Sequence, residues 1–276
     1  MEIKKGVFSE LIPKLLLMPI LIIKILIAPL LIGLTTLAGR KYGHTISGLL
    51  VGLPLTSGPI AFILALQHGI TFAITSSKGI LLGIIAVGVF SLTYAWTAKL
   101  FHWTICLLTS WGAFFIVTFF LNRVNFNLYT SFLFVVVSLS ATLFSFPEYK
   151  DDQIQITPPM WDIPLRMIVA TIFIIGLTNC SKILGAQLSG LLAPLPVYGT
   201  IFAGSTHFLY GANATTKLLK GIVIGSFSFA SFFLIVGQFI STIGIGWTFL
   251  FTTLTTLVLQ GIYILLFHKK KVAAEH

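Results

Sequence analysis

Apolar residues are grouped into long runs, which polar residues, prolines and glycines separate. Most runs have roughly 20 residues, enough to cross the hydrocarbon core of a bilayer as an α-helix. The strict alternation of polar and apolar residues that marks a membrane-spanning strand is absent. The pattern predicts an all-α polytopic membrane protein with about nine transmembrane helices. We expect them at residues 20–38, 43–68, 79–98, 100–121, 126–145, 163–180, 185–209, 221–237 and 244–267.

The second half of the chain repeats the first at a shift of 142 residues, without a gap. Seven residues between Gly43 and Pro54 recur at the equivalent positions between 185 and 196, and Lys78-Gly79-Ile80 recurs as residues 220–222. Gly79 and Gly83 form a GxxxG pair that also recurs and is typical of helix packing. We therefore expect two four-helix units, with span 5 as an unpaired linker. The expected divisions are an interfacial segment 1–19, repeat 1 at 20–121, a linker span and polar connector at 122–161, repeat 2 at 162–267 and a basic tail at 268–276.

The number of crossings between the copies predicts their relative orientation. Four spans and a linker make five crossings, so the second copy enters the bilayer from the opposite side, as in transporters with inverted repeats. If spans 2 and 7 were re-entrant hairpins instead, the copies would be parallel. The 26 residues of span 2 make a helix of about 39 Å, which favours one broken crossing over a hairpin.

Spans 2 and 7 are both interrupted by proline and glycine. Pro54 and Pro196 each remove a backbone donor and crowd the preceding turn. Interrupted backbone at membrane depth is tolerated where it is buried in protein or lines a wet cavity, and half-helix N-termini favour anions. A plain proline kink is the alternative explanation for either break alone. The candidate substrate-binding residues at the two breaks are Pro54, Thr56, Ser57, Gly58, Pro196, Tyr198 and Gly199.

Charge narrows the classes of substrate. The chain is 57% hydrophobic and 9% charged, with a formal net charge of +10. Its basic residues are mostly scattered singly near span ends, which indicates topology signals and contacts with membrane lipids rather than nucleic-acid binding. None of the seven acidic residues falls in the middle of an apolar run. Carboxylates inside a membrane commonly relay protons or balance cationic substrates, so their absence argues against a carboxylate-based proton pathway and a cationic substrate.

Four cations and two histidines are further candidates for substrate contact. The cations occupy equivalent places in the two copies, and simple snorkelling or anchoring is the alternative role for each. The histidines lie in the broken spans, where a structural hydrogen bond is the alternative and a proton-binding role is conceivable. No metal site, cofactor motif or nucleophile–base pair is visible, so an enzyme is not expected. These candidates are Lys24, Arg166, Lys78, Lys220, His68 and His207.

The segment Ile46-Ser47-Gly48-Leu49-Leu50-Val51-Gly52-Leu53-Pro54, followed by an apolar stretch, Gln67-His68-Gly69 and another span, resembles the GlpM family of small bacterial inner-membrane proteins. The second copy, at residues 188–196, is similar to it too. The resemblance covers under half of the chain, mainly spans 2 and 3 of each copy. It implies a fused, internally inverted version of a protein with about four spans, and a link to envelope exopolysaccharide.

These observations lead to three functional hypotheses. The first is a secondary transporter in the cell (inner) membrane, which binds a small anionic or amphipathic organic substrate between the broken helices. The second is a translocator of a lipid or polyprenyl phosphate. The third is a non-transporting accessory subunit of envelope polysaccharide assembly. The partners expected are thus a small-molecule or lipid substrate and the surrounding membrane lipids, and no nucleic acid.

Overall fold

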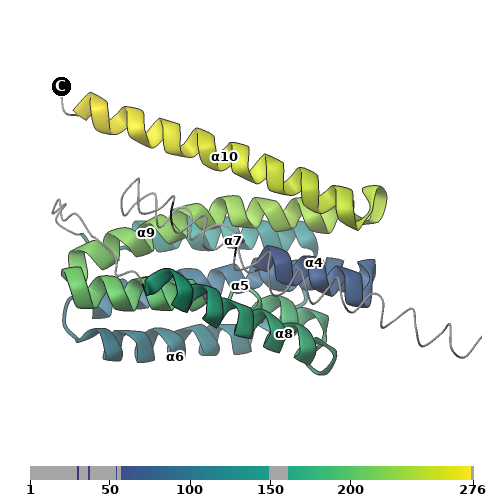
Figure 1. Cartoon of the computed structure of the whole chain (residues 1–276), viewed down its shortest axis with the longest axis horizontal. Helices are drawn as coiled ribbons and strands as arrows, with labels where there is room; N and C mark the ends of the chain where they lie inside the picture. The colour runs from purple at the N-terminus through teal and green to yellow at the C-terminus, as the bar shows by residue number, and fades with distance from the viewer. Residues whose placement is uncertain (1–29, 31–36, 38–53, 55–56, 149–160, 275–276) are drawn as a thin grey trace, which may run out of the picture.

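The computed structural model describes residues 57–148 and 161–274, together with the single positions 30, 37 and 54. Within 57–148 and 161–274 the chain is helical and contains no strand. The helices run along a common direction and form one bundle, with α10 diverging at its C-terminal end (Figure 1). They are α4 (Ser57–His68), α5 (Ile70–Thr97), α6 (Trp103–Leu121), α7 (Leu128–Phe144), α8 (Asp162–Leu192), α9 (Val197–Ile243) and α10 (Ile245–Ala274).

The described helices have the length and composition of membrane spans. Four segments are long and apolar enough to cross a bilayer, with mean hydropathy between 1.8 and 2.0: Ile70–Thr97, Trp103–Leu121, Ile163–Leu192 and Gly199–Ile243. Leu128–Phe144 and Ile245–Val258 are shorter apolar helices. The prediction of a helical, membrane-type protein is confirmed at this level.

Four glycines mark two of the helix ends and two sharp bends in the described structure. Gly69, Gly185, Gly211 and Gly244 have φ between 74° and 83°, with ψ close to 180°. Residues with side chains are strained in this backbone region, which is essentially reserved for glycine. Gly69 separates α4 from α5, and Gly244 separates α9 from α10.

The other two glycines lie inside helices and divide them. Gly185 leaves residues 186–192 as a short segment of α8. Gly211 leaves residues 197–210 as the first segment of α9 and 212–243 as its second segment. The chain between Asp162 and Ile243 is thus a series of four helical segments with sharp joints.

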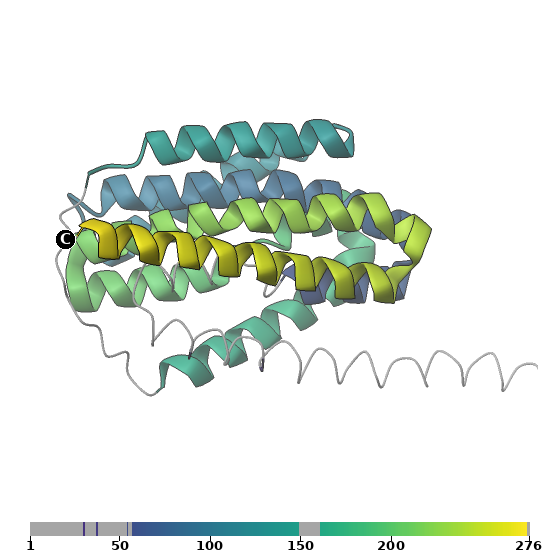
Figure 2. The same ribbon diagram turned by 90° about the horizontal axis from the view of Figure 1, so that it is seen from above.

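Helix α5 is at the centre of the bundle. It packs against α4, α6, α7, α8 and α9, and Figure 2 shows α7 along one side of the molecule and the start of α8 along the other. Fully buried side chains of α5 include Ile80, Leu81, Phe90 and Tyr94. Helix α5 thus contacts the helices on both sides of the interruption at residues 193–196.

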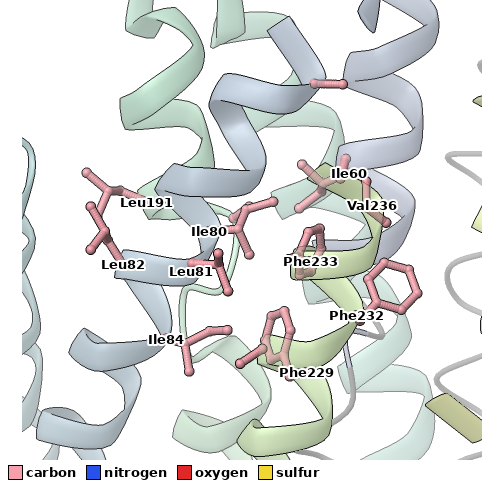
Figure 3. Packing of buried hydrophobic residues seen from close by; sticks show 14 of the residues in the cluster. Ile60, Ile80, Leu81, Leu82, Ile84, Leu191, Phe229, Phe232, Phe233 and Val236 are labelled. Carbon is pink, nitrogen blue, oxygen red and sulfur yellow. The ribbon is translucent and has the colours of Figure 1, made fainter. Parts of the chain in front are cut away.

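The largest apolar cluster joins α5 to the second segment of α9. Ile80, Leu81 and Ile84 of α5 face Phe229 and Phe233 of α9 across the middle of the bundle (Figure 3). The two phenylalanine rings are themselves in contact, with centroids 5.4 Å apart. Aromatic and branched side chains fill the space between α5 and the second segment of α9, so these helices form the rigid frame of the described structure.

The peripheral helices α6 and α10 each bury a stripe of residues and expose large apolar side chains elsewhere, as far as their side chains are described. In both helices most of the buried positions are spaced by four residues, as expected for one face of an α-helix. Large apolar side chains cover their other faces, which in a bilayer contact lipid. The buried stripes are Cys106, Ser110, Phe114 and Thr118 on α6, and Thr248, Thr252 and Thr256 on α10.

Two helices begin earlier than the apolar pattern predicted. Span 3 was expected to start at residue 79 but α5 starts at Ile70, and span 8 was expected at 221 although its helix starts at 212. The polar residues in the early part of α5 explain the difference. Thr75 and Ser77 donate their hydroxyl protons to carbonyls one turn back, so these side chains are satisfied within the helix.

The remaining expectations about architecture extend beyond the described residues. Span 1, the first half of span 2 and most of the polar connector lie largely or wholly outside them. The division of the chain into domains stays a prediction.

Candidate functional site

The second of the two predicted helix breaks lies between α8 and α9. Helix α8 ends at Leu192, residues 193–196 belong to no helix, and α9 begins at Val197. Pro194 and Pro196 have no backbone N–H, so neither can continue a helical ladder. The interruption is therefore a direct result of the sequence Ala-Pro-Leu-Pro.

The first break is visible at its C-terminal side. Pro54 lies outside any helix, and α4 begins three residues later at Ser57. The Gly58 amide donates to the Pro54 carbonyl at 2.8 Å, which ties the proline to the first turn of α4. Residues 55 and 56 are outside the described part of the chain, and Thr56 is one of them.

A buried hydrogen bond connects the two breaks. The Ser57 hydroxyl donates to the Ala193 carbonyl oxygen at 2.9 Å, although the residues are 136 positions apart in sequence. Both residues are buried, at 1% and 0% exposure. A backbone carbonyl released by the interruption in one half of the chain is thus satisfied by a side chain at the interruption in the other half.

Other groups near the second break are satisfied locally. The Leu195 amide donates to the Leu192 carbonyl at 3.0 Å, and the Val197 amide donates to the Leu195 carbonyl at 2.7 Å. The Thr200 amide and hydroxyl both donate to the Pro196 carbonyl, at 2.7 and 2.6 Å. The break is therefore an ordered structure with defined partners.

Each break also contacts a phenylalanine on a central helix. A Cβ built on Gly58 would be 3.9 Å from both Pro54 and Phe232, and one built on Gly199 would be 3.4 Å from Pro196 and 3.8 Å from Phe90. Phe90 and Phe232 are 142 residues apart, as are the two prolines. The surroundings of the two breaks are thus built from equivalent residue types.

The short segment of α8 approaches α5 unusually closely next to this site. Gly79 and Gly190 face each other, and a Cβ built on Gly190 would be 3.0 Å from the Cα of Gly79. One turn further along α5, a Cβ on Gly83 would be 2.6 Å from the Pro194 ring. Glycine at these positions allows the backbone of the break to lie directly on the central helix.

The structure brings only some of the predicted site residues together. Pro54, Ser57 and Gly58 on one side and Pro196 and Gly199 on the other form the paired breaks. Lys24 and Thr56 lie outside the described residues. Arg166 is in the first part of α8 and Tyr198 is in the first turn of α9, and the structure describes their backbones alone. The described cations and histidines, Lys78, Lys220, His68 and His207, lie on α5, α4 and α9, and their role as substrate contacts stays a prediction.

His68 is the last residue of α4, eleven residues after Ser57. Its Nε2 atom is 2.8 Å from the Ser181 hydroxyl oxygen, and its ring lies 4.4 Å from that of Phe72. The Ser181 hydroxyl donates its own proton to the Thr178 carbonyl at 2.7 Å. The serine oxygen therefore accepts from His68 Nε2–H, which assigns the protonated nitrogen of this ring.

His207 is near the C-terminal end of the first segment of α9. Its Nδ1 atom is 3.3 Å from the hydroxyl oxygen of Tyr94 on α5. Sequence reasoning did not identify Tyr94 or Ser181, because each is a polar group within an apolar run. Each is 113 residues from its histidine, and no sequence motif indicated either pair.

Lys78 and Lys220 are inside helices and not at span ends. Each is eight residues after the start of its helical segment, about 12 Å along the axis at 1.5 Å per residue. Both are half-buried. Within the described ranges the acidic residues are Glu148, which is exposed, and Asp162, the first residue of α8. The described helices thus carry cations at depth without carboxylates there.

The described residues hold no group of three or more histidine, cysteine, aspartate or glutamate side chains that could bind a metal ion. Comparison of the chain with protein-family models, with curated proteins and with solved structures found no match.

Proposed function

We propose that the chain is built from two four-helix repeats of opposite orientation, joined by α7. Gly69 and Gly211, which are 142 residues apart, have nearly the same backbone angles, with φ of 83° and 79°. The helical segments that follow them start at residues 70 and 212, again 142 apart, and α6 and α10 start at Trp103 and Ile245. This agreement in helix boundaries supports a structural duplication that covers more than the identical residues.

The direction of the chain supports an inverted arrangement. The turn from α4 into α5 is at one end of the bundle, and the turn between the first and second segments of α9 is at the opposite end (Figures 1 and 2). Span 1 lies outside the described residues. The other eight spans would correspond to α4, α5, α6, α7, the first part of α8, the two segments that flank the second break, the second segment of α9, and α10, so the chain would have about nine spans. In this proposal α7 is the linker that reverses the second copy.

The orientation can be tested by labelling from the two sides of the membrane. Ile70 and Phe208 are exposed residues next to the equivalent turns, and each would be replaced singly by cysteine after Cys106 and Cys180 are changed to serine. A membrane-impermeant maleimide should label I70C and F208C from opposite sides. Labelling from the same side would contradict the inverted arrangement.

We propose that the protein is a multi-pass secondary transporter of the cell (inner) membrane, which binds a small anionic or amphipathic organic substrate where the two breaks meet. The observation that carries this proposal is the Ser57–Ala193 hydrogen bond between the interrupted helices. Transporters with inverted repeats commonly bind substrate at the junction of discontinuous helices, because half-helix ends present unpaired backbone groups near the midplane. Helices α4 and α9 both begin at this junction.

Electrostatics favour an anion or a neutral amphiphile. The N-termini of α4 and α9 carry partial positive charge. A cation that loses its hydration in the membrane needs a carboxylate or ordered carbonyls, and the described helix interiors have no carboxylate. Lys78 and Lys220 add positive charge at equivalent depths in the two copies.

The transport hypothesis is tested with purified full-length protein in lipid vesicles. Permanently charged probes separate the substrate classes: benzenesulfonate as an amphipathic anion, inorganic phosphate as a hydrophilic anion, and tetraethylammonium as a cation. We expect uptake of an anion above the level of protein-free vesicles and none of tetraethylammonium. Uptake of the cation would overturn the assignment of substrate charge.

Two lysine variants test the residues involved. K78Q and K220Q should weaken the apparent affinity for the transported anion by about tenfold or more, since a hydrogen bond to a charged group contributes about 1.5–3 kcal/mol. K99Q is the matched control, because Lys99 is exposed and lies against the ring of Trp96, 5.0 Å from its centroid. Equal effects of all three variants would indicate loss of general surface charge.

The same vesicles distinguish the two other hypotheses. Protein-dependent movement of a fluorescent phospholipid between leaflets, without anion uptake, would favour the lipid or polyprenyl-phosphate translocator. Neither activity would favour the accessory subunit, which the resemblance to the GlpM family and its link to exopolysaccharide would suit.

A further inference from the structure

A contact between Tyr94 and His207 joins α5 to the first segment of α9, near the C-terminal end of that segment. The Tyr94 hydroxyl oxygen is 3.3 Å from His207 Nδ1, and the two rings meet edge to face with centroids 5.8 Å apart. The Tyr94 side chain is fully buried, whereas His207 is partly exposed. The imidazole is therefore accessible from the surface of the bundle, whereas the Tyr94 hydroxyl is not.

The charge of His207 determines whether this hydrogen bond can form as it stands. In the neutral ring that carries its proton on Nε2, the lone pair of Nδ1 accepts the proton of the Tyr94 hydroxyl, and the burial of that hydroxyl favours this tautomer. When Nδ1 is protonated it becomes a donor, and the two groups present hydrogens to each other. In the described part of the chain His207 is the partner of the buried Tyr94 hydroxyl, so that hydroxyl proton would then lack an acceptor. An unpaired buried donor is unfavourable, and separation of the helices relieves it.

His68 at the end of α4 behaves differently. Because the Ser181 hydroxyl already donates to the Thr178 carbonyl, its oxygen accepts from His68 Nε2–H. That N–H is present in both the neutral and the protonated ring, so protonation leaves this contact intact. Of the His68 and His207 contacts, only Tyr94–His207 therefore responds to a proton.

The first segment of α9 is also placed to move. It begins at the non-helical residues 193–196, next to Ser57, and ends at the glycine joint Gly211. A helical segment between two such joints can tilt as a unit, because the change in backbone angles is confined to its ends. Release of its C-terminal end from α5 would therefore alter the break at its N-terminal end.

Resting on the proposed transport function, we propose that His207 is the proton-binding site that drives it, and that a proton on Nδ1 releases the first segment of α9 from Tyr94. The proton comes from water on the side that His207 faces and returns to water when the imidazole is again neutral, and Tyr94 keeps its own proton throughout. The coupling ion is thus a proton held by an imidazole, in helices whose described interiors have no carboxylate.

Other titratable groups near His207 come from the neighbouring helices. Tyr94 faces it from α5. From α6 and its N-cap, Cys106 lies near Tyr94 and His102 lies near His207. His102 is exposed and contacts the Thr104 hydroxyl at 3.2 Å. A pH experiment therefore needs a variant that removes the His102 ring as a control.

Hydrogen–deuterium exchange on the full-length chain in lipid nanodiscs tests the release directly, without a substrate. After correction for the intrinsic effect of pH on exchange, the first segment of α9 should lose protection by about tenfold as the pH is lowered from 7.5 to 5.5. In H207Q the glutamine oxygen can still accept from Tyr94 but binds no proton, so protection should stay high at pH 5.5 and 7.5. In Y94F protection should be low at both pH values.

H68Q and H102Q serve as controls and should keep the pH response of the wild type. A wild-type segment equally protected at both pH values, or an H207Q variant that responds like the wild type, would overturn the proposal. The wild-type measurement is decisive even if a variant fails to fold.

Uptake of benzenesulfonate and phosphate, measured in parallel, separates the two proposals. If exchange responds to pH as expected but neither probe is transported, the transport proposal fails and the proton-sensitive contact stands. If an anion is transported with the same pH dependence in the wild type and H207Q, transport stands and the role of His207 is wrong.

Discussion

Replacement of Gly79 or Gly190 by alanine is expected to destabilise the protein, because the backbones of α5 and the short segment of α8 touch at these glycines. A Cβ on Gly79 would collide with the Gln187 carbonyl oxygen and lie 3.0 Å from the Leu191 amide nitrogen. A Cβ on Gly190 would collide with the Ser76 carbonyl oxygen and lie 3.0 Å from the Cα of Gly79. The obstacles are backbone atoms, so no side chain can rotate away.

The magnitude follows from the need to move whole helices. Ordinary carbon contacts require roughly 3.5 Å or more, so the helices must separate by several tenths of an ångström or more. Overpacking of this kind costs about 1–3 kcal/mol. Since Gly79 and Gly190 meet at one crossing, the separation forced by the first methyl group accommodates part of the second. The double variant should therefore cost less than the sum of the single variants.

The assay is reversible unfolding in mixed micelles with increasing sodium dodecyl sulfate, followed by tryptophan fluorescence. Gly112→Ala on α6 is the matched control, because a Cβ there meets nothing within 4 Å and alanine is a better helix former than glycine. If Gly79→Ala and Gly190→Ala unfold at the midpoint of the wild type, or if the double variant is strictly additive, the backbones of α5 and the short segment of α8 are not in contact at these glycines.

Three further predictions use the same unfolding assay. Gly221→Ala should be as destabilising as Gly79→Ala if the copies are structurally equivalent, whereas a neutral effect would argue against the duplication. Gly69→Ala and Gly211→Ala should each lower the free energy of unfolding by about 1–3 kcal/mol, because both glycines have a positive φ that alanine adopts only with strain. A decrease below about 0.5 kcal/mol would show that these joints relax freely. Ser57→Ala should lower the free energy of unfolding by about 1–3 kcal/mol, because it leaves a buried carbonyl of the other break unpaired. Ser91→Ala should leave the free energy of unfolding unchanged, because that buried hydroxyl has no hydrogen-bond partner in the described structure.

Features of the fold that depend on the backbone in a bilayer could be predicted from the sequence. Long apolar runs predict helices because lipid offers no partners for N–H and C=O groups. The Ala-Pro-Leu-Pro sequence predicts an interruption because two of its four residues have no amide proton. The structure has a helix end at Leu192 and a new helix at Val197, as this reasoning requires. Both inferences need only local chemistry.

Features that depend on which helices meet could not be predicted from the sequence. The GxxxG spacing of Gly79 and Gly83 indicated helix packing but not the partner, which is the short segment of α8. The Tyr94–His207 and His68–Ser181 contacts join residues far apart in sequence. The repeat did not indicate them either, because the positions equivalent to His68 and His207 in the other copy are Tyr210 and Ala65. Helix starts were missed for a related reason, because hydropathy counts a hydroxyl as polar even when it donates to its own helix.

The way the two halves contact each other gives a physical reason for their presence in one chain. Ser57, from the first half, satisfies the Ala193 carbonyl of the second, and α5 of the first half provides the glycine surface on which Pro194 and Gly190 lie. Neither half, taken alone, offers both the interrupted backbone and the partners that satisfy it.

In a membrane an unsatisfied carbonyl costs several kilocalories per mole, so a single copy would need a second copy to pair with. Under the proposed inverted arrangement, two identical copies would have to insert in opposite orientations to make these contacts, and a linker with an odd number of crossings, such as α7, would ensure that outcome. Expressed as separate polypeptides, residues 1–121 and 122–276 should therefore be unstable individually and recover the anion uptake of the full chain only when co-expressed. Stable, monodisperse protein from either part alone would show that the contacts between the breaks are not what holds the fold together.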